Sequence, residues 1–173
     1  MQIPPKFEQD IRQKHTNLVP AVYIHTYGVG SSPDIYMSTN SLDLPFHSGS
    51  QAHWRPILLN VPSLKESIDI EKRNYKISSV NIDISNAPYD GTRFSELVNN
   101  TSLINEECRI YWISPSVTNI PEQPNAAPLD DSAFQVYFGV IRRYEHDDEK
   151  VKLVVEDRSQ AKLHIDLPHN TLE

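Results

Sequence analysis

The clearest structural signal in this sequence is VNIDIS at residues 80–85. Three aliphatic residues, Val80, Ile82 and Ile84, alternate there with polar residues. Side chains on a β-strand point to opposite faces with a period of two, so the pattern predicts a strand with one buried and one solvated face. Antiparallel sheets commonly leave one face in water, and this stretch therefore favours an antiparallel β fold.

Other segments with strand composition surround this stretch. Residues 20–26 (PAVYIHT) and 107–114 (ECRIYWIS) are rich in the β-branched and aromatic residues that are enriched in strands. WRPILLN, which contains Pro56, predicts a strand at a sheet edge because proline has no amide donor. This strand is expected over residues 54–60. Two more strands are expected within 63–86, around a polar turn at Glu71–Asn74. A hairpin of 134–144 with 150–157 is expected around the acidic turn EHDDE.

Two short helices are expected beside these strands. Phe7, Ile11 and Leu18 fall near helical spacing, but they give only a thin apolar face. Such a face suits an arm that packs on a neighbour better than a free-standing helix. The second helix follows a turn at Asp90–Gly91, with Thr92 as its expected N-cap.

These elements together predict an all-β, β-dominated fold. The strands are short, and no alternation of strands with helices indicates a parallel sheet, so we expect a small barrel or sandwich of short antiparallel strands with one or two short helices and an N-terminal arm. The expected organisation is an arm over residues 1–19, a barrel or sandwich domain over residues 20–168, and residues 169–173 as a C-terminal tail or the start of a following segment.

The composition limits the partners of the protein. Its formal net charge is −7, and Lys and Arg form no cluster that would neutralise phosphates, which argues against a nucleic-acid-binding protein. An acidic protein can still line a channel that DNA passes without specific binding, because like charges repel. No apolar run reaches the ~18 residues of a membrane helix, and the N-terminus lacks a signal-peptide core, so we expect no membrane-spanning segment.

One stretch near the end of the chain has the residue types of an active site. EDRSQAKLHIDLP (156–168) supplies Glu156, Asp157 and His164 as acid, base and orienting group of a hydrolase. The spacing from Asp157 to Gln160 also has the form of a helix capping box. We therefore interpret the stretch as a strand end, a cap and a connector, and expect no enzymatic activity.

The other candidate residues carry weaker signals. His47 and His53 lie six residues apart in a loop, which is a poor metal-ligand pattern, and a solvated hairpin tip is expected at the acidic residues after His146. Cys108, the single cysteine, lies in an apolar run and is expected in the core. We assign no catalytic, cofactor-binding or metal-binding residue and no cofactor. An alternative function, a soluble β-sandwich module that binds carbohydrate or peptide, depends on four loop or edge aromatics: Tyr27, Tyr36, Trp54 and Tyr89.

The order of several segments resembles a known class of proteins. The segments are VPSLKESIDIEKRNYKISSVNIDISN with RFSELV, then INEECRIYWISPS, then VYFGVIRRYEHDDEKVKLVVEDRSQAKLHIDLP. Together they resemble the N-terminal region of structural proteins of bacteriophage tails, most closely long virion proteins of marine phages that act as tail hub or baseplate components. The resemblance covers about residues 54–168 and includes no catalytic motif.

This resemblance implies a role in assembly. Proteins of this class have β-barrel domains that form a ring around an axial channel. The implied partners are copies of the same chain and neighbouring tail proteins (tube, baseplate, fibre or tape-measure components), and DNA would be only a non-specific passenger in the channel. The implied location is the virion tail, assembled in the host cytoplasm. The N-terminal arm and the loop at 115–132 are the expected contacts with neighbours.

Overall fold

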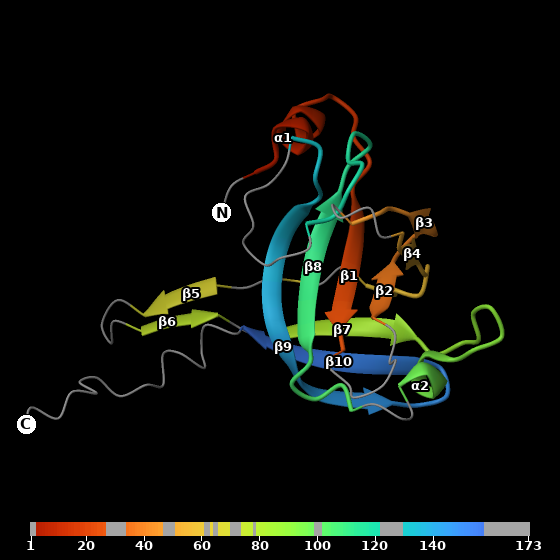
Figure 1. Ribbon diagram of the computed structural model, residues 1–173. Helices are drawn as coiled ribbons and strands as arrows, with labels where there is room; N and C mark the ends of the chain where they lie inside the picture. Colours follow the sequence, from red (N-terminus) through yellow and green to blue (C-terminus); the bar gives the residue numbers. More distant parts are fainter. Residues whose placement is uncertain are drawn as a thin grey trace, which may run out of the picture.

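A computed structural model describes residues 3–26, 34–46, 51–60, 63, 66–69, 74–77, 79–98, 102–121 and 130–157, with the backbone alone for 66–69 and 74–77. The fold is mostly β, as predicted (Figure 1). The elements in chain order are α1 (Pro5–Ile11), β1 (Val19–His25), β2 (Ile35–Ser38), β3 (Leu42–Asp43), β4 (His53–Trp54), β5 (Glu66–Asp69), β6 (Asn74–Ile77), β7 (Val80–Ser85), α2 (Phe94–Leu97), β8 (Glu107–Ile113), β9 (Phe134–His146) and β10 (Lys150–Asp157).

The main structure is a curled antiparallel sheet of six strands in the order β2-β1-β8-β9-β10-β7. Figure 1 shows β1 and β8 crossing steeply over β7 and β10, with the long β9 bending from one set to the other. Residues 55–60 connect the two edges of this half-barrel. Ser38 of β2 donates its amide hydrogen to the Arg55 carbonyl at 2.9 Å, and Ser85 of β7 donates to the Ile57 carbonyl at 2.7 Å. Both edge strands therefore have backbone partners.

The inside of the curled sheet holds the main hydrophobic core. The prediction from VNIDIS is confirmed, because Val80, Ile82 and Ile84 of β7 are all fully buried while Asn81 is exposed. Cys108 is also fully buried there, as predicted. The other large residues enclosed in this core include Val22, Ile24, Met37, Phe94, Leu103, Ile141 and Leu153.

A second apolar cluster covers the outer face of β1 and β8. Trp54 of β4 and Tyr111 of β8 lie in it, both fully buried. Its other large members are Phe7, Val19, Tyr23, Phe46, Ile113, Val117 and Ile120. β1 and β8 are thus buried on both faces, which explains why their sequences are continuous apolar runs while that of β7 alternates.

Several predicted boundaries were wrong. Residues 63–86 contain three strands, since β6 pairs with β5 but β7 pairs with β10, so the chain changes its strand partner after Ile77. Of the strand predicted over 54–60, only Trp54 belongs to a strand, β4. The β9–β10 turn is shorter than predicted because β9 continues to His146. The N-cap of α2 is Arg93, because Thr92 makes two backbone hydrogen bonds with Tyr89 in the preceding turn.

The N-terminal helix α1 packs on its own domain. Phe7 is buried against Phe134, with ring centroids 5.2 Å apart, whereas Ile11 remains 39% exposed. The carboxylate of Asp10 accepts hydrogen bonds from the hydroxyl of Ser114 at 2.6 Å and from the amide and hydroxyl of Ser116 at 2.9 and 2.8 Å. These bonds lower the pKa of Asp10 below its ordinary value. The helix therefore has a partner within the chain.

Asp10→Asn is expected to lower the melting temperature by several degrees near neutral pH, because the neutral amide cannot accept all three hydrogen bonds. The folded-state pKa of Asp10 is depressed, so its contribution is complete above the ordinary value of 3.8 and is lost as the pH falls through the folded-state pKa. Thermal melts of both proteins should therefore differ near pH 7 and converge in acid. A difference that stays constant into acid would contradict this role.

Candidate functional site

A pocket of about 240 Å³ lies beside β2 and β4, and we call it the His53 pocket. Its wall combines segments that are far apart in the sequence: the start of β2, the chain around β4, the turn before α2, and α2 itself. The lining residues are Asp34, Ile35, Tyr36, Gln51, Ala52, His53, Arg55, Asp90 and Leu97. Charged, polar and apolar groups therefore meet in one small concave site.

Asp34 is held in place by three hydrogen bonds. Its Oδ2 accepts from the hydroxyl of Tyr23 at 2.8 Å, and its Oδ1 accepts from His25 Nδ1 at 2.9 Å and from the Thr26 amide at 3.2 Å. Burial and this bond to Asp34 raise the pKa of Tyr23, so the phenol stays protonated as a donor. A carboxylate has about four acceptor positions, and described residues occupy three of those on Asp34.

His53 is also oriented by neighbours on both sides of its ring. Its Nδ1 lies 2.7 Å from Oδ1 of Asp43, and its Nε2 lies 3.4 Å from the hydroxyl of Tyr89. A carboxylate can only accept, so Nδ1 carries the proton and Nε2 is the acceptor of the neutral ring. The imidazole also stacks on Tyr89, with an interplanar angle of 16°.

Three polar side chains of the pocket make no hydrogen bond or ion pair with other described residues. Among the residues that the structure describes, no hydrogen bond or ion pair engages the guanidinium of Arg55, the amide of Gln51 or the carboxylate of Asp90. Arg55 is half-buried, whereas Gln51 and Asp90 are exposed at the rim. An unpaired guanidinium in a half-buried position keeps hydrogen-bonding capacity that a ligand could use.

The aromatic residues singled out from the sequence partly converge on this pocket. Tyr36 lines it, and Tyr89 stacks on its His53. The expectation that Trp54 is exposed is wrong: it is fully buried beneath Tyr36, with ring centroids 5.4 Å apart, because the outer face of β1 needs a cover. Tyr27 lies outside the described residues. Sequence analysis did not single out Asp34, Gln51 or Arg55, since their loop and edge positions carry no spacing pattern.

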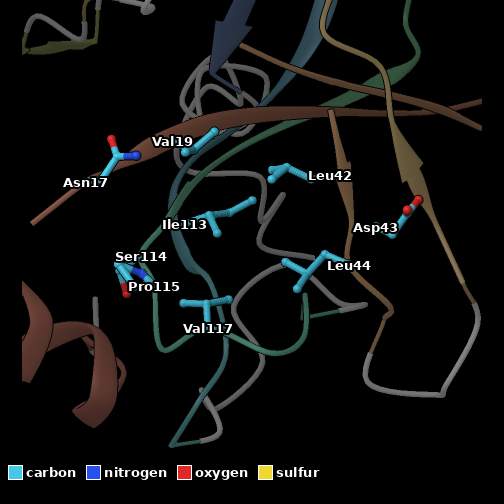
Figure 2. Close-up of a pocket in the computed structure, with 9 residues that line it drawn as sticks. All are labelled: Asn17, Val19, Leu42, Asp43, Leu44, Ile113, Ser114, Pro115 and Val117. Atoms are coloured by element: carbon cyan, nitrogen blue, oxygen red, sulfur yellow. The ribbon is translucent and has the colours of Figure 1, made fainter. Parts of the chain in front are cut away.

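A second cavity, of about 350 Å³, is lined by residues of β1, β3 and β8 and of the segments next to them (Figure 2). Figure 2 shows Val19, Leu42 and Ile113 on one side of it and Leu44 with Val117 on another. Asn17, Asp43, Ser114 and Pro115 complete the lining. This cavity is mostly apolar and offers no cluster of charged groups, so it has the features of a gap in the second apolar cluster.

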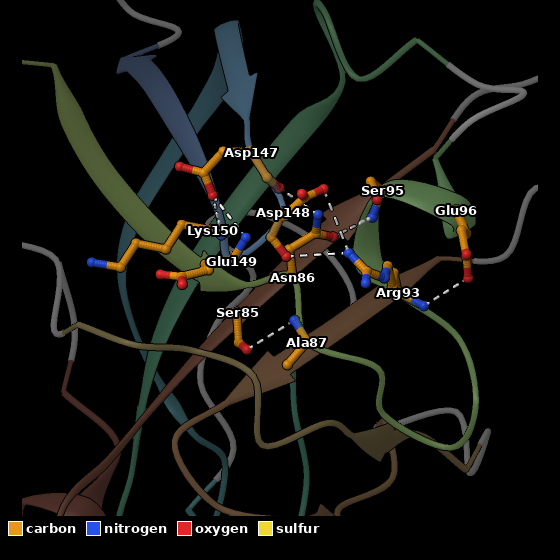
Figure 3. A network of polar contacts seen from close by, with 10 residues as sticks. All are labelled: Ser85, Asn86, Ala87, Arg93, Ser95, Glu96, Asp147, Asp148, Glu149 and Lys150. Carbon is orange, nitrogen blue, oxygen red and sulfur yellow. Dashed lines mark hydrogen bonds and ion pairs between the residues drawn. The ribbon is translucent and has the colours of Figure 1, made fainter.

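The acidic turn between β9 and β10 has a structural role, because hydrogen bonds connect it to α2 (Figure 3). The Oδ1 of Asp147 accepts from the amides of Glu149 and Lys150 at 2.8 and 2.7 Å, which lowers the pKa of Asp147. Buried Asn86 connects this turn to α2: its side-chain amide donates to the Asp147 carbonyl at 2.7 Å, and its Oδ1 accepts from the Ser95 amide at 3.0 Å. The turn is exposed, as expected for a hairpin tip, and the Asp147 side chain stabilises its backbone conformation.

Of the three residues of the hydrolase alternative, the structure describes Glu156 and Asp157. Glu156 and Asp157 are the last residues of β10, as the prediction of a strand end required. The carboxylate of Glu156 bonds to Arg142 Nε at 3.1 Å on the surface. His164 and the capping box at Gln160 lie outside the described residues.

The described residues also bear on metal and thiol chemistry. They include no group of three or more His, Cys, Asp or Glu side chains placed to hold a metal ion, and His47 lies outside them. Burial raises the pKa of Cys108 to about 12, so its thiol is a core group and not a nucleophile. In the part of the chain that the structure covers, no helix is long and apolar enough to cross a membrane.

Comparisons with known protein families and with curated proteins gave no match for this sequence.

Proposed function

We propose that this protein is a structural component of a bacteriophage tail, in the hub, baseplate or tail tip, and not an enzyme. It assembles with copies of itself and with neighbouring tail proteins into a ring around an axial channel, and its location is the virion. The segments that resemble tail proteins include α2 and the strands β7, β8, β9 and β10, and these strands are four of the six in the curled sheet.

The hairpin of β5 and β6 is the observation that carries this proposal. Its strands pair with each other, Glu66 opposite Ile77 and Asp69 opposite Asn74. No backbone hydrogen bond links it to the other residues that are described, and Figure 1 shows it extending away from the curled sheet. An isolated two-stranded hairpin is marginally stable in water, and its outer edges present unpaired backbone groups. Pairing with a strand of a neighbouring subunit would stabilise it.

The outer strands of the main sheet are less suited than this hairpin to pair with a neighbouring subunit, because another segment partly covers them. Residues 55–60 cover parts of both outer strands, β2 and β7, and Asn60 adds a side-chain bond to the amide of Asp83 at 3.0 Å. Strand addition at those covered positions would require this segment to leave. No described residue covers the β5–β6 hairpin in this way, which supports it as the place where a partner strand is added.

Replacing Glu66–Ile77 by a short Gly-Ser linker is expected to abolish self-association while leaving the barrel folded. Native mass spectrometry and sedimentation velocity would measure the oligomer, and circular dichroism would report the melting temperature. Lys152→Ala, on the solvated face of β10, is the matched surface control and should assemble as the parent does. Retention of the same oligomer without the hairpin would contradict its role as the assembly element.

The location requires a separate measurement. Mass spectrometry of purified virions of the encoding phage should detect the protein in a fixed copy number, and electron microscopy should place it at the tail tip. A protein that is monomeric at all concentrations and absent from virions would rule out the tail function.

A further inference from the structure

We propose that the His53 pocket binds one ring of a neutral carbohydrate. This inference does not depend on the tail function, because it arises from the lining of the pocket alone. The pocket has three properties that together select this ligand class: an apolar wall beside polar groups, charges of both signs, and an acceptor, the Asp34 carboxylate, already held in a fixed position.

The size and the apolar wall suit a small amphipathic ring. A volume of about 240 Å³ is below the ~300–1,000 Å³ of pockets for drug-sized ligands. Buried Ile35 and Ala52 and half-buried Leu97 supply the apolar part of the lining. A pyranose has one face rich in C–H groups that can contact such residues, while its hydroxyl groups point to the rim.

The charges of the lining favour a neutral ligand. The lining includes two carboxylates, those of Asp34 and Asp90, and a single guanidinium, that of Arg55. An anion would be attracted by Arg55 and repelled by both carboxylates, and a cation would be attracted by both carboxylates and repelled by Arg55, so a charged ligand of either sign meets a group of its own sign. A sugar hydroxyl can donate to a carboxylate and accept from a guanidinium, so a polyol can satisfy groups of both signs at once.

The polar groups also have the arrangement of a prepared site. Tyr23, His25 and Thr26 hold the Asp34 carboxylate and, among the described residues, occupy three of its about four acceptor positions. Arg55 offers a planar fork of donors, and a fork can bind two adjacent hydroxyl groups. Because Asp34 does not have to be ordered when the ligand arrives, its contribution to binding is not reduced by a loss of side-chain entropy.

The test is a titration of the isotope-labelled full chain, followed by amide NMR shifts. The probes are D-glucose, D-galactose and N-acetylglucosamine, with glucuronate and inorganic phosphate as anionic probes. At least one neutral sugar should shift the amides of His53 and Arg55 with a dissociation constant on the order of 1 mM, as expected for a ligand with so few atoms. Arg55→Ala should weaken this binding about tenfold or more. Arg143→Ala, which removes an exposed arginine outside the pocket, should leave it unchanged.

Asp90→Asn separates neutral from anionic ligands. Asparagine tolerates the left-handed backbone of this position (φ 51°), so the fold should be preserved. Loss of the carboxylate should weaken a neutral sugar, which donates to it, and should strengthen an anion, which it repels. Binding of phosphate or glucuronate in preference to the neutral sugars, with tighter binding to the Asp90→Asn protein, would overturn the proposal. So would the absence of any sugar-induced shift in a large excess of all three neutral probes.

Discussion

Trp54→Ala is expected to lower the free energy of unfolding by about 3–5 kcal/mol, the range found when a fully buried aromatic side chain is truncated. The indole is fully buried in the second apolar cluster and packs edge-on against Tyr36 at 5.4 Å. Its Nε1 donates to the Leu44 carbonyl at 3.3 Å, which would be left without this donor. Urea denaturation followed by far-UV circular dichroism would measure the loss.

Two further variants define what the Trp54 result means. Trp54→Phe keeps most of the buried ring and should lie between the parent and the alanine variant. Leu59→Ala removes an apolar side chain that is 51% exposed, and it should change stability by no more than ~0.5 kcal/mol. A loss below ~1 kcal/mol for Trp54→Ala would show that the outer apolar cluster does not contribute to the stability of the domain.

Gly139→Ala is expected to cost about 3 kcal/mol, at the upper end of the usual range for overpacking. Gly139 lies in β9 between Cys108 of β8 and Asp157 of β10. A Cβ atom there would approach the Glu156 carbonyl oxygen to 2.4 Å and a methyl group of Val155 to 2.9 Å. A backbone carbonyl in a paired strand cannot move away without breaking the ladder, so β9 and β10 would have to separate locally.

Gly91→Ala is the matched comparison for this effect. Gly91 has a positive φ of 78° but no atom within 4 Å of an added Cβ, so its cost is backbone strain alone, roughly 1 kcal/mol. Denaturation of both variants should give the larger loss for Gly139. Equal losses would show that β9 and β10 can adjust to a side chain at this position.

The two proposed activities belong to different parts of the molecule. Figure 1 shows the β5–β6 hairpin on one side of the curled sheet and the β3–β4 pair on the other. A strand added to the hairpin would therefore lie on the side of the sheet away from β4 and the His53 pocket. The linker variant and the Arg55→Ala variant should accordingly affect one activity each.

The sequence predicted the fold class well and the site poorly. The alternation in β7 and the apolar runs of β1 and β8 indicated strands, and the structure contains them with nearly the predicted bounds. The aromatic residues were identified by type, yet type did not distinguish buried Trp54 from pocket-lining Tyr36. Asp34 and Arg55 lie in stretches without periodicity, and nothing local indicated that they share a pocket.

The sequence by itself therefore determined the strands β1, β7 and β8, the β-dominated class and the buried cysteine. These follow from the two-residue period of a strand and from the cost of exposing apolar side chains, and both act within a few neighbouring residues. The tertiary structure alone decided that β1 and β8 are buried on both faces, that residues 55–60 join β2 to β7, and that Asp34, Arg55 and Asp90 meet in one pocket. These features depend on strand order and on contacts between residues far apart in the chain, which local patterns do not specify.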